Sequence, residues 1–200
     1  MDRLLLATNN KGKIEELRAL LNDLQIQFLT PEDIHLSLDV EEDGKTYAEN
    51  ASKKAIAFAQ ASGLISLADD SGLEVDALHG APGLYSARYS QKPGAKDADR
   101  RAYLLQNLRG KPRPWTAHFR ATIAIAPPGG KVKFAEGRCE GEIIPEERGT
   151  GGFGYDRIFF IPEVGSTMAE LDMDEKNRLS HRARAVMNAK PILIEMFGTH

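Results

Sequence analysis

Hydrophobic residues near the start of the chain change their spacing, which predicts a strand, a helix and a second strand. Arg3 to Ala7 is predicted to be a short apolar strand. Thr8-Asn9-Asn10 then supplies helix-capping side chains, and apolar residues recur at helical spacing from Ile14 to Leu24. Ile26 to Leu29 is the next predicted strand, and the polar, acidic stretch from Thr30 to Lys45 is predicted to be a long loop.

The same alternation continues in the following stretch. Thr46 with Glu49 forms a capping-box pattern, which opens a helix that Gly63 is expected to end. A buried strand from Leu64 to Ala68 then leads directly into Asp69-Asp70-Ser71-Gly72. Another helix is predicted over Ala98 to Leu108.

The second half of the chain is predicted to begin with a hairpin. Trp115 to Ala126 and Lys131 to Ile143 are its two strands, joined by a Pro-Pro-Gly-Gly turn. The glycine-rich loop Gly149 to Gly154 precedes a strand over Ile158 to Ile161. Ser180 is predicted to cap a last helix, which Pro191 must kink or interrupt.

Together these elements predict an α/β fold with a mixed, strongly twisted sheet flanked by helices. The 200 residues, with 42% hydrophobic and 28% charged residues, suit one globular domain. No internal repeat, low-complexity tract or linker marks a domain boundary. We therefore expect residues 1–200 to form a single elongated domain, with two lobes and a central active-site cleft.

Composition and charge narrow the possible functions. A net charge of −3 argues against binding to a nucleic-acid backbone, whereas small local groups of basic residues suit the phosphates of a free nucleotide. The single cysteine, Cys139, has no partner for an intramolecular disulfide. The N-terminal apolar run is too short for a signal peptide or a membrane span, so we expect a cytoplasmic protein with no membrane partner.

The first candidate for a binding site is the segment between the first strand and the first helix, Thr8-Asn9-Asn10-Lys11-Gly12-Lys13. Backbone N–H groups and the positive end of the helix dipole favour an anion there, and the lysines add full charges. The spacing differs from that of a Walker A loop. The alternative is a capped helix whose lysines are merely solvated.

The second candidate is the pair of carboxylates Asp69-Asp70, which follows a buried strand. Two buried carboxylates are costly unless a cation or hydrogen-bond donors meet them, and Mg²⁺ prefers carboxylate and phosphate oxygens. One of the pair can then activate a water molecule for attack on phosphorus. The alternative is an Asp-Ser-Gly turn in which Asp69 bonds to the backbone.

The acidic stretch Glu41-Glu42-Asp43 offers further metal ligands. A magnesium site built on Asp70 needs more oxygen atoms, and either Glu41 or Glu42 can supply them. Lys54, on the helix that follows, either faces a phosphate or points to water. Charge runs in loops are usually just solvated, and Glu49 already has a structural role in the capping box.

Two segments in the last quarter of the chain suggest a pocket for a base. Phe153 and Tyr155, held between Gly154 and other glycines, can offer a flat face to a purine ring, and Asp156 can accept a hydrogen bond. Lys176, followed by Ser180-His181-Arg182, places an imidazole and a guanidinium at a helix start, where they can meet a carbonyl-bearing base edge. A glycine-rich turn and a surface histidine are the alternatives.

Taken together and in this order, the motifs resemble those of the inosine/xanthosine triphosphate pyrophosphatases, the Ham1-like family of non-standard purine triphosphatases. The resemblance covers nearly the whole chain, from about Leu4 to the final helix. It is carried by TNNKGK (8–13), ENASKKA (49–55), ADDSGL (68–73), APGLYSARY (81–89), GTGGFGYD (149–156) and SHRARA (180–185).

The resemblance implies a magnesium-dependent enzyme that converts ITP, dITP or XTP to the monophosphate and pyrophosphate, usually as a homodimer. It implies that Asp70 is the proton acceptor and a metal ligand, with Glu41 or Glu42 as the acidic partner. The residues that it implies in substrate binding are Thr8, Asn9, Asn10, Lys11, Gly12, Lys13, Lys54, Ser71, Phe153, Gly154, Tyr155, Asp156, Lys176, His181 and Arg182.

The chain departs from the family pattern at one position, where Arg157 follows Phe-Gly-Tyr-Asp in place of a common proline. We expect this change to alter the rigidity of the loop. Three alternative functions remain to be compared with the proposed one. These are a pyrophosphatase for other nucleotides, such as pyrimidine triphosphates in the Maf-like proteins, a nucleotide sensor without catalysis, and an RNA-binding module, which the net acidity disfavours.

Overall fold

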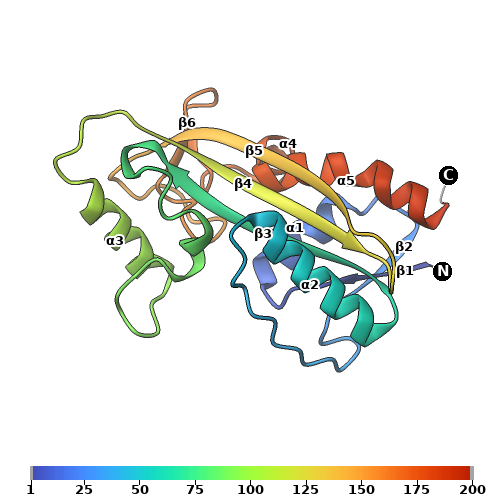
Figure 1. Cartoon of the computed structure of the whole chain (residues 1–200). Coiled ribbons are helices and arrows are strands. Elements are labelled where there is room, and N and C mark those ends of the chain that lie inside the picture. Colours follow the sequence, from blue (N-terminus) through green and yellow to red (C-terminus); the bar gives the residue numbers. More distant parts are fainter. Residues whose placement is uncertain (1, 199–200) are drawn as a thin grey trace. The chain divides into compact units, whose positions relative to one another are not determined.

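The computed structural model describes residues 2–198, which divide into two compact units. Unit 1 comprises the residues up to Asp70, Ala121–Gly137 and the residues from Arg182 onwards, whereas unit 2 comprises Ser71–Arg120 and Arg138–His181. Figure 1 shows the path of the chain and labels its helices and strands. No helix within residues 2–198 has the length and apolar character needed to cross a membrane.

Helices and strands alternate in unit 1 as the hydrophobic pattern predicts. Its elements are β1 (Asp2–Leu6), α1 (Lys11–Leu20), β2 (Ile26–Leu29) and α2 (Tyr47–Ser62), together with the first part of β3 (Ile65–Val75) and all of α5 (His181–Phe197) except its first residue. The Thr46 side chain caps α2 by accepting a hydrogen bond from Glu49 N–H at 3.1 Å. Gly63 ends α2 in the left-handed conformation, with φ 69°, which a glycine adopts without strain.

Unit 2 contains the rest of β3 and most of the elements that follow it. These are the short 3-10 helices η1 (Asp76–Leu78) and η2 (Gly83–Arg88), then α3 (Asp97–Leu108), β6 (Phe159–Ile161), β7 (Ser166–Thr167) and α4 (Met173–Leu179). The predicted hairpin strands are β4 (Trp115–Ala126) and β5 (Lys133–Ile143), each of which contributes residues to both units.

The seven strands form one sheet in the order β2-β1-β3-β4-β5-β6-β7. β1 pairs in parallel with β2 and β3, whereas β6 pairs antiparallel with β5 and β7. This confirms the predicted α/β class and the mixed sheet.

Alternate residues of the strands in unit 1 pack against different helices. Leu4, Leu6 and Leu67 belong to one buried cluster with residues of α1 and α5. Their neighbours Leu5 and Ala68 belong to another cluster, with residues of α2. Because successive side chains of a strand point to opposite faces, helices cover both faces of this part of the sheet.

Unit 2 has a core of its own. Leu104 and Leu108 of α3 pack in it with β3 residues such as Leu73, and all three are fully buried. The rings of Phe119 and Phe159 lie in the same cluster, with centroids 4.5 Å apart.

The structure corrects four details of the predicted elements. α1 ends at Leu20, so the helical spacing up to Leu24 extends past the helix. β3 continues through Asp69 and Asp70 to Val75, so this segment is not a turn. α5 runs past Pro191 without interruption. α4 has no apolar stripe long enough to predict it, and its start is marked by a capping box between Asp172 and Glu175.

Candidate active site

The first predicted segment forms the capped N-terminus of α1. The Asn10 side chain accepts a hydrogen bond from Lys13 N–H at 3.1 Å, and Thr8 Oγ1 accepts one from Asn10 N–H at 3.2 Å. Asn9, Asn10 and Lys11 are exposed. The first N–H groups of a helix have no partner within the helix, so this exposed end is suited to bind an anion.

A buried network of charges links α1, β3 and the start of α5. Lys13 Nζ lies 3.0 Å from Asp69 Oδ1, and Arg182 Nε donates to Asp69 Oδ2 at 2.5 Å. Arg182 Nη1 also forms an ion pair with Glu16 Oε2. Burial alone raises the pKa of Asp69, but Arg182 and Lys13 outweigh it and hold the pKa well below its usual range.

Asp70 lies on the opposite face of β3 from Asp69, among residues of α2. Burial raises the pKa of the Asp70 carboxyl, although the charges of Lys54 and Lys13 and a hydrogen bond from Asn50 oppose the shift. Asp70 therefore binds a proton more readily than an ordinary aspartate does. This property suits a group that accepts a proton from water.

Asn50 is held by the loop in front of α2. Its Oδ1 accepts a hydrogen bond from Gly44 N–H at 2.8 Å. A Cβ on Gly44 would come within 2.5 Å of that oxygen, so only glycine allows this approach. The bond fixes the amide whose NH₂ group faces Asp70.

The two candidate acidic partners of Asp70 lie in different surroundings. Glu42 is half-buried, forms an ion pair with Lys54 and raises the pKa of Asp70 through its charge. Glu41 is exposed, and its charge acts on Lys53 instead. Within residues 2–198 no group of three or more His, Cys, Asp or Glu side chains is placed to hold a metal ion by itself.

The second group of predicted residues lies in unit 2, around the glycine-rich loop. Asp156 Oδ2 accepts hydrogen bonds from Phe153 N–H at 3.1 Å and from Lys176 Nζ at 2.8 Å. Lys176 Nζ lies 5.4 Å from the centre of the Phe153 ring. A Cβ on Gly152 would come within 2.1 Å of Asp156 Oδ2, so this ion pair requires glycine at that position.

The remaining predicted residues have distinct surroundings. His181 stacks on Phe119, with ring centroids 4.7 Å apart, and belongs to unit 2. Tyr155 is buried and donates to the Ser86 carbonyl oxygen at 2.8 Å, so its hydroxyl group helps to hold the fold. Ser71 follows Asp70 directly on β3.

Each unit thus brings several of the predicted residues together. Lys13, Lys54 and Asp70 interact in unit 1, and Phe153, Asp156 and Lys176 interact in unit 2. Glu16 and Asn50 were not predicted. Asn50 lies within the ENASKKA motif, which is the signal that identifies it, whereas Glu16 occupies an ordinary helical position and carries no such signal.

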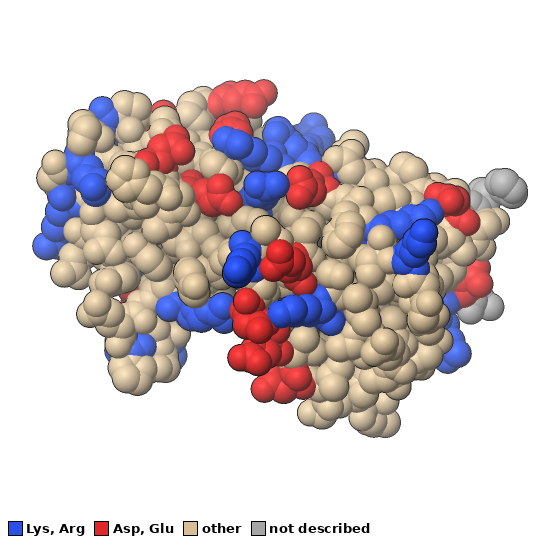
Figure 2. Space-filling view, viewed as in Figure 1, with Lys and Arg blue, Asp and Glu red and all other residues tan. Residues whose placement is uncertain are grey.

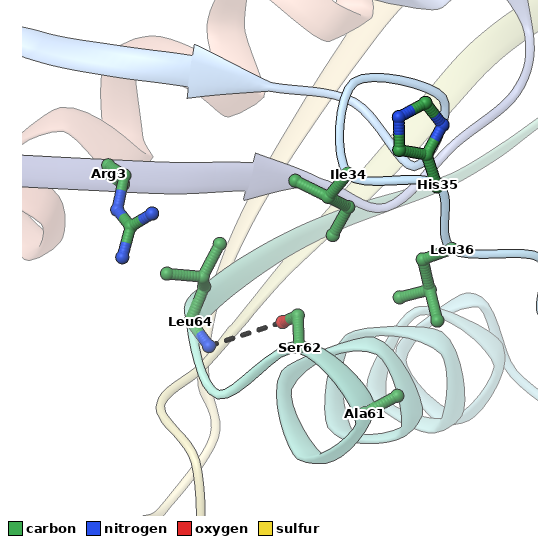
Figure 3. Close-up of a pocket in the computed structure, with 7 residues that line it drawn as sticks. All are labelled: Arg3, Ile34, His35, Leu36, Ala61, Ser62 and Leu64. Atoms are coloured by element: carbon green, nitrogen blue, oxygen red, sulfur yellow. Dashed lines mark hydrogen bonds between the residues drawn. The ribbon is translucent and has the colours of Figure 1, made fainter.

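A separate hollow of about 260 Å³ lies in unit 1, near the end of α2. Figure 3 shows the apolar side chains of Ile34, Leu36 and Leu64 around it, with Leu64 N–H donating to Ser62 Oγ at 3.2 Å. None of the predicted site residues lines this hollow, and neither an aspartate nor a glutamate does. It is therefore not the candidate active site.

The mixed sheet flanked by helices places the chain among the α/β proteins, with an exposed helix N-terminus and a buried carboxyl of raised pKa near lysines as its candidate site. The chain belongs to the Ham1 family, whose model matches residues 4–192.

Named relatives and a solved structure agree with this membership. The chain is 51% identical to a dITP/XTP pyrophosphatase of Desulforamulus reducens, over 98% of this chain and 97% of the relative. It is 52% identical to a dITP/XTP pyrophosphatase of Geobacter sulfurreducens, over 93% and 94%. The structure of a HAM1 protein from Coxiella burnetii superposes with a TM-score of 0.88 at 41% identity, covering 98% of this chain and 100% of that one.

Proposed function

We propose that this protein hydrolyses non-standard purine nucleoside triphosphates, namely ITP, dITP and XTP, to the monophosphate and pyrophosphate. The observation that carries the proposal is Asp70, a buried carboxyl with a raised pKa beside Lys13 and Lys54. The printed activity of the relatives, dITP/XTP pyrophosphatase, supports the choice of substrate. Such an enzyme cleanses the nucleotide pool.

In the proposed reaction Asp70 accepts a proton from a water molecule as the water oxygen attacks the α-phosphorus. The bond from water oxygen to phosphorus forms, and the bond from phosphorus to the bridging oxygen breaks. Pyrophosphate then leaves with the electron pair of that bond. The N-terminus of α1, from Thr8 to Lys13, would bind the phosphates through backbone N–H groups and the lysine charges.

Magnesium is the proposed cofactor, with Asp70 and Glu42 as its protein ligands. The two carboxylates are close enough for the charge of Glu42 to raise the pKa of Asp70, and Mg²⁺ typically uses one or two carboxylates together with substrate phosphates and water. Asp70 and Glu42 would hold the ion there, and Mg²⁺ when bound would supply positive charge to the phosphates. Lys54, which forms an ion pair with Glu42, would help to orient that carboxylate.

The residues around the glycine-rich loop are proposed to bind the nucleoside. The Phe153 ring would stack on the purine, and the polar groups of Asp156, Lys176 and His181 would distinguish a 6-keto from a 6-amino group. A required hydrogen bond excludes the wrong base strongly, since the polar group would otherwise be left buried and unpaired. The guanidinium of Arg182 already donates to Asp69 and Glu16, so its contact with the base stays a prediction.

Three further expectations from the sequence also stay predictions: the cytoplasmic location, the homodimer, and the absence of a nucleic-acid partner. On the face shown in Figure 2, many basic side chains lie beside acidic ones and do not gather into one large basic patch. This distribution supports a free nucleotide as the ligand.

The test is hydrolysis by the purified protein with magnesium, using ITP, dITP, XTP, GTP, ATP and dTTP in turn. Pyrophosphate and orthophosphate are measured separately, and Asp70→Asn is the matched variant because it keeps the shape and removes the base. We expect pyrophosphate from ITP, dITP and XTP, with kcat/KM at least about a hundredfold above that for ATP and lost in Asp70→Asn.

The other outcomes point to specific alternatives. Release of orthophosphate would mean attack at the γ-phosphorus and would contradict the mechanism. Pyrophosphate mainly from dTTP would keep the chemistry and reject the purine pocket. Tight binding of ITP without turnover would identify a nucleotide sensor.

A further inference from the structure

Gly154 of the glycine-rich loop forms hydrogen bonds with helix α3 through both its N–H group and its carbonyl oxygen. Gly154 N–H donates to Asp97 Oδ2 at 2.7 Å, and Arg101 Nη1 donates to the Gly154 carbonyl oxygen at 2.8 Å. Asp97 and Arg101 are four residues apart, so both side chains extend from the same face of the helix. The backbone of Gly154 is left-handed, with φ 61°, and its two hydrogen-bonding groups are fixed by side chains of one helix.

Arg101 is itself held in place by a residue just before the loop. Its Nε and Nη2 donate to Glu147 Oε1 and Oε2 at 2.7 and 3.0 Å, a bidentate pair. The Arg101 side chain is 7% exposed, so solvent screens this pair only weakly at the guanidinium. Asp97 is held in a similar way by an ion pair with Arg100.

The residue just after the loop joins the same set of charges. Arg157 Nη1 lies 3.7 Å from Glu147 Oε2, and Arg148 N–H donates to the Arg157 carbonyl oxygen at 2.9 Å. A proline at this position would fix the backbone φ through its ring. In this chain, side chains restrain the loop instead. Asp97 and Arg101 bind Gly154, and Glu147 binds both Arg101 and Arg157. We call these four residues the Gly154 clamp.

Restraint of Gly154 acts on Phe153, its neighbour in the chain. The Phe153 N–H donates to Asp156, and the Phe153 ring faces Lys176 Nζ. These contacts define the direction of the ring only if the following peptide group is fixed as well. The Gly154 clamp fixes that peptide group.

We propose that Asp97 and Arg101 are positioning residues that hold Phe153 in place for the nucleoside base, and that they thereby set substrate affinity and base selectivity. The inference rests on the proposed function, because it assumes that the base binds at Phe153. Neither residue touches the reacting atoms in this scheme. Their loss should therefore change KM much more than kcat.

The experiment compares steady-state hydrolysis of ITP and GTP by the wild-type protein and three variants with magnesium. Arg101→Met keeps the length of the side chain but removes its hydrogen bonds, Arg101→Lys keeps the charge, and Asp97→Ala removes the acceptor of Gly154 N–H. We expect KM for ITP to rise about tenfold in Arg101→Met and Asp97→Ala, with kcat within about twofold and a smaller ratio of kcat/KM for ITP over GTP. Arg101→Lys should recover part of the loss.

Lys92→Met is the matched control. Lys92 forms an exposed ion pair with Asp99 at 2.6 Å at the same end of α3 and, within residues 2–198, has no hydrogen bond or ion pair with the loop. It should leave KM and selectivity unchanged. A folded Arg101→Met or Asp97→Ala variant with wild-type KM and selectivity would overturn the proposal, and so would a loss confined to kcat.

Hydrogen exchange separates this inference from the proposed function. The peptide that covers residues 149–158 should exchange faster in Arg101→Met than in Lys92→Met, whether or not ITP is hydrolysed. If the wild-type protein does not hydrolyse ITP, the proposed function fails. If exchange in this peptide is unchanged in Arg101→Met, the clamp itself is refuted. If Arg101→Met does not fold, the same measurements of KM, selectivity and hydrogen exchange are made on Asp97→Ala and Arg101→Lys.

Discussion

Asp69 and Asp70 are neighbours of the same type whose surroundings give them different chemistry. The charge of Asp69 is stabilised by Lys13 and Arg182, so its pKa is lowered. The charge of Asp70 is disfavoured by burial, so its pKa is raised. The alternation of side chains along a strand produces this difference, because it turns the two carboxylates toward different helices.

Because of this difference, removing the charge of Asp69 should lower the stability of the protein, whereas removing that of Asp70 should not. Asp69→Asn leaves Lys13 without its anion and Arg182 with Glu16 alone, and breaking a buried ion pair typically costs about 3–5 kcal/mol. Asp70→Asn removes a charge that burial disfavours, so the free energy of unfolding should stay the same or rise, although activity is lost. Urea denaturation measures both. Equal destabilisation by the two variants would contradict the assignment.

The pKa of Glu147 predicts a pH dependence of stability. The hydrogen bonds from Arg101 lower this pKa. A lowered pKa in the folded state means that the stabilisation is fully present above the unfolded pKa, about 4.3, and is lost as the pH falls through the folded value. Between about pH 6 and about pH 3 the wild-type protein should therefore lose more stability than Glu147→Gln. The exposed Glu163→Gln is the control and should follow the wild type.

At the scale of elements, α1 and α2 begin in the same way but serve different purposes. Asn10 caps α1 and Thr46 caps α2, each by accepting a hydrogen bond from an N–H group three residues later. The start of α1 is exposed and faces the proposed phosphates, whereas α2 presents Asn50 and Lys54 from within the helix.

The two caps provide a matched test. Asn10→Ala and Thr46→Ala should each reduce the free energy of unfolding by about 1 kcal/mol, since each removes one capping bond. Only Asn10→Ala should also raise KM for ITP, because it loosens the backbone that is proposed to bind phosphate. Thermal denaturation and steady-state kinetics on both variants provide the comparison. A similar rise of KM in both would show that the effect is general.

Most helices and strands could be predicted because the spacing of apolar residues within each short stretch of sequence indicates its secondary structure. The end of β3 was not predicted, because two aspartates, a serine and a glycine have low strand propensity. Contacts with distant residues such as Lys13 and Arg182 stabilise the strand there, and no local pattern contains them. The ion pair of Glu16 with Arg182 could not be predicted for the same reason. Asp70 and Phe153, in contrast, could be identified from their motifs.

At the scale of the whole molecule, unit 1 is assembled from three separate stretches of the chain and unit 2 from two. Each unit has its own buried clusters, but β3, β4 and β5 contribute residues to both. A strand that belongs to two cores cannot lose its structure in one without affecting the other. The two units therefore should not behave as independently folding domains.

Calorimetry on core variants tests this cooperativity. Leu67→Ala in unit 1 and Leu104→Ala in unit 2 each remove a fully buried side chain, and each should cost about 2–5 kcal/mol. We expect both variants to show one transition at a lower temperature. Two separated transitions, of which each variant shifts only one, would contradict the prediction.

The continuation of β3 through Asp69 and Asp70 also limits how this gene segment can change in length. Deleting one residue between Ile65 and Ala68 would shift the side chains that follow onto the opposite faces of the sheet. Asp70 would then point toward Arg182 and Lys13, and Asp69 toward the opposite face of the sheet. The segment therefore cannot gain or lose a single codon without exchanging the surroundings of the two aspartates.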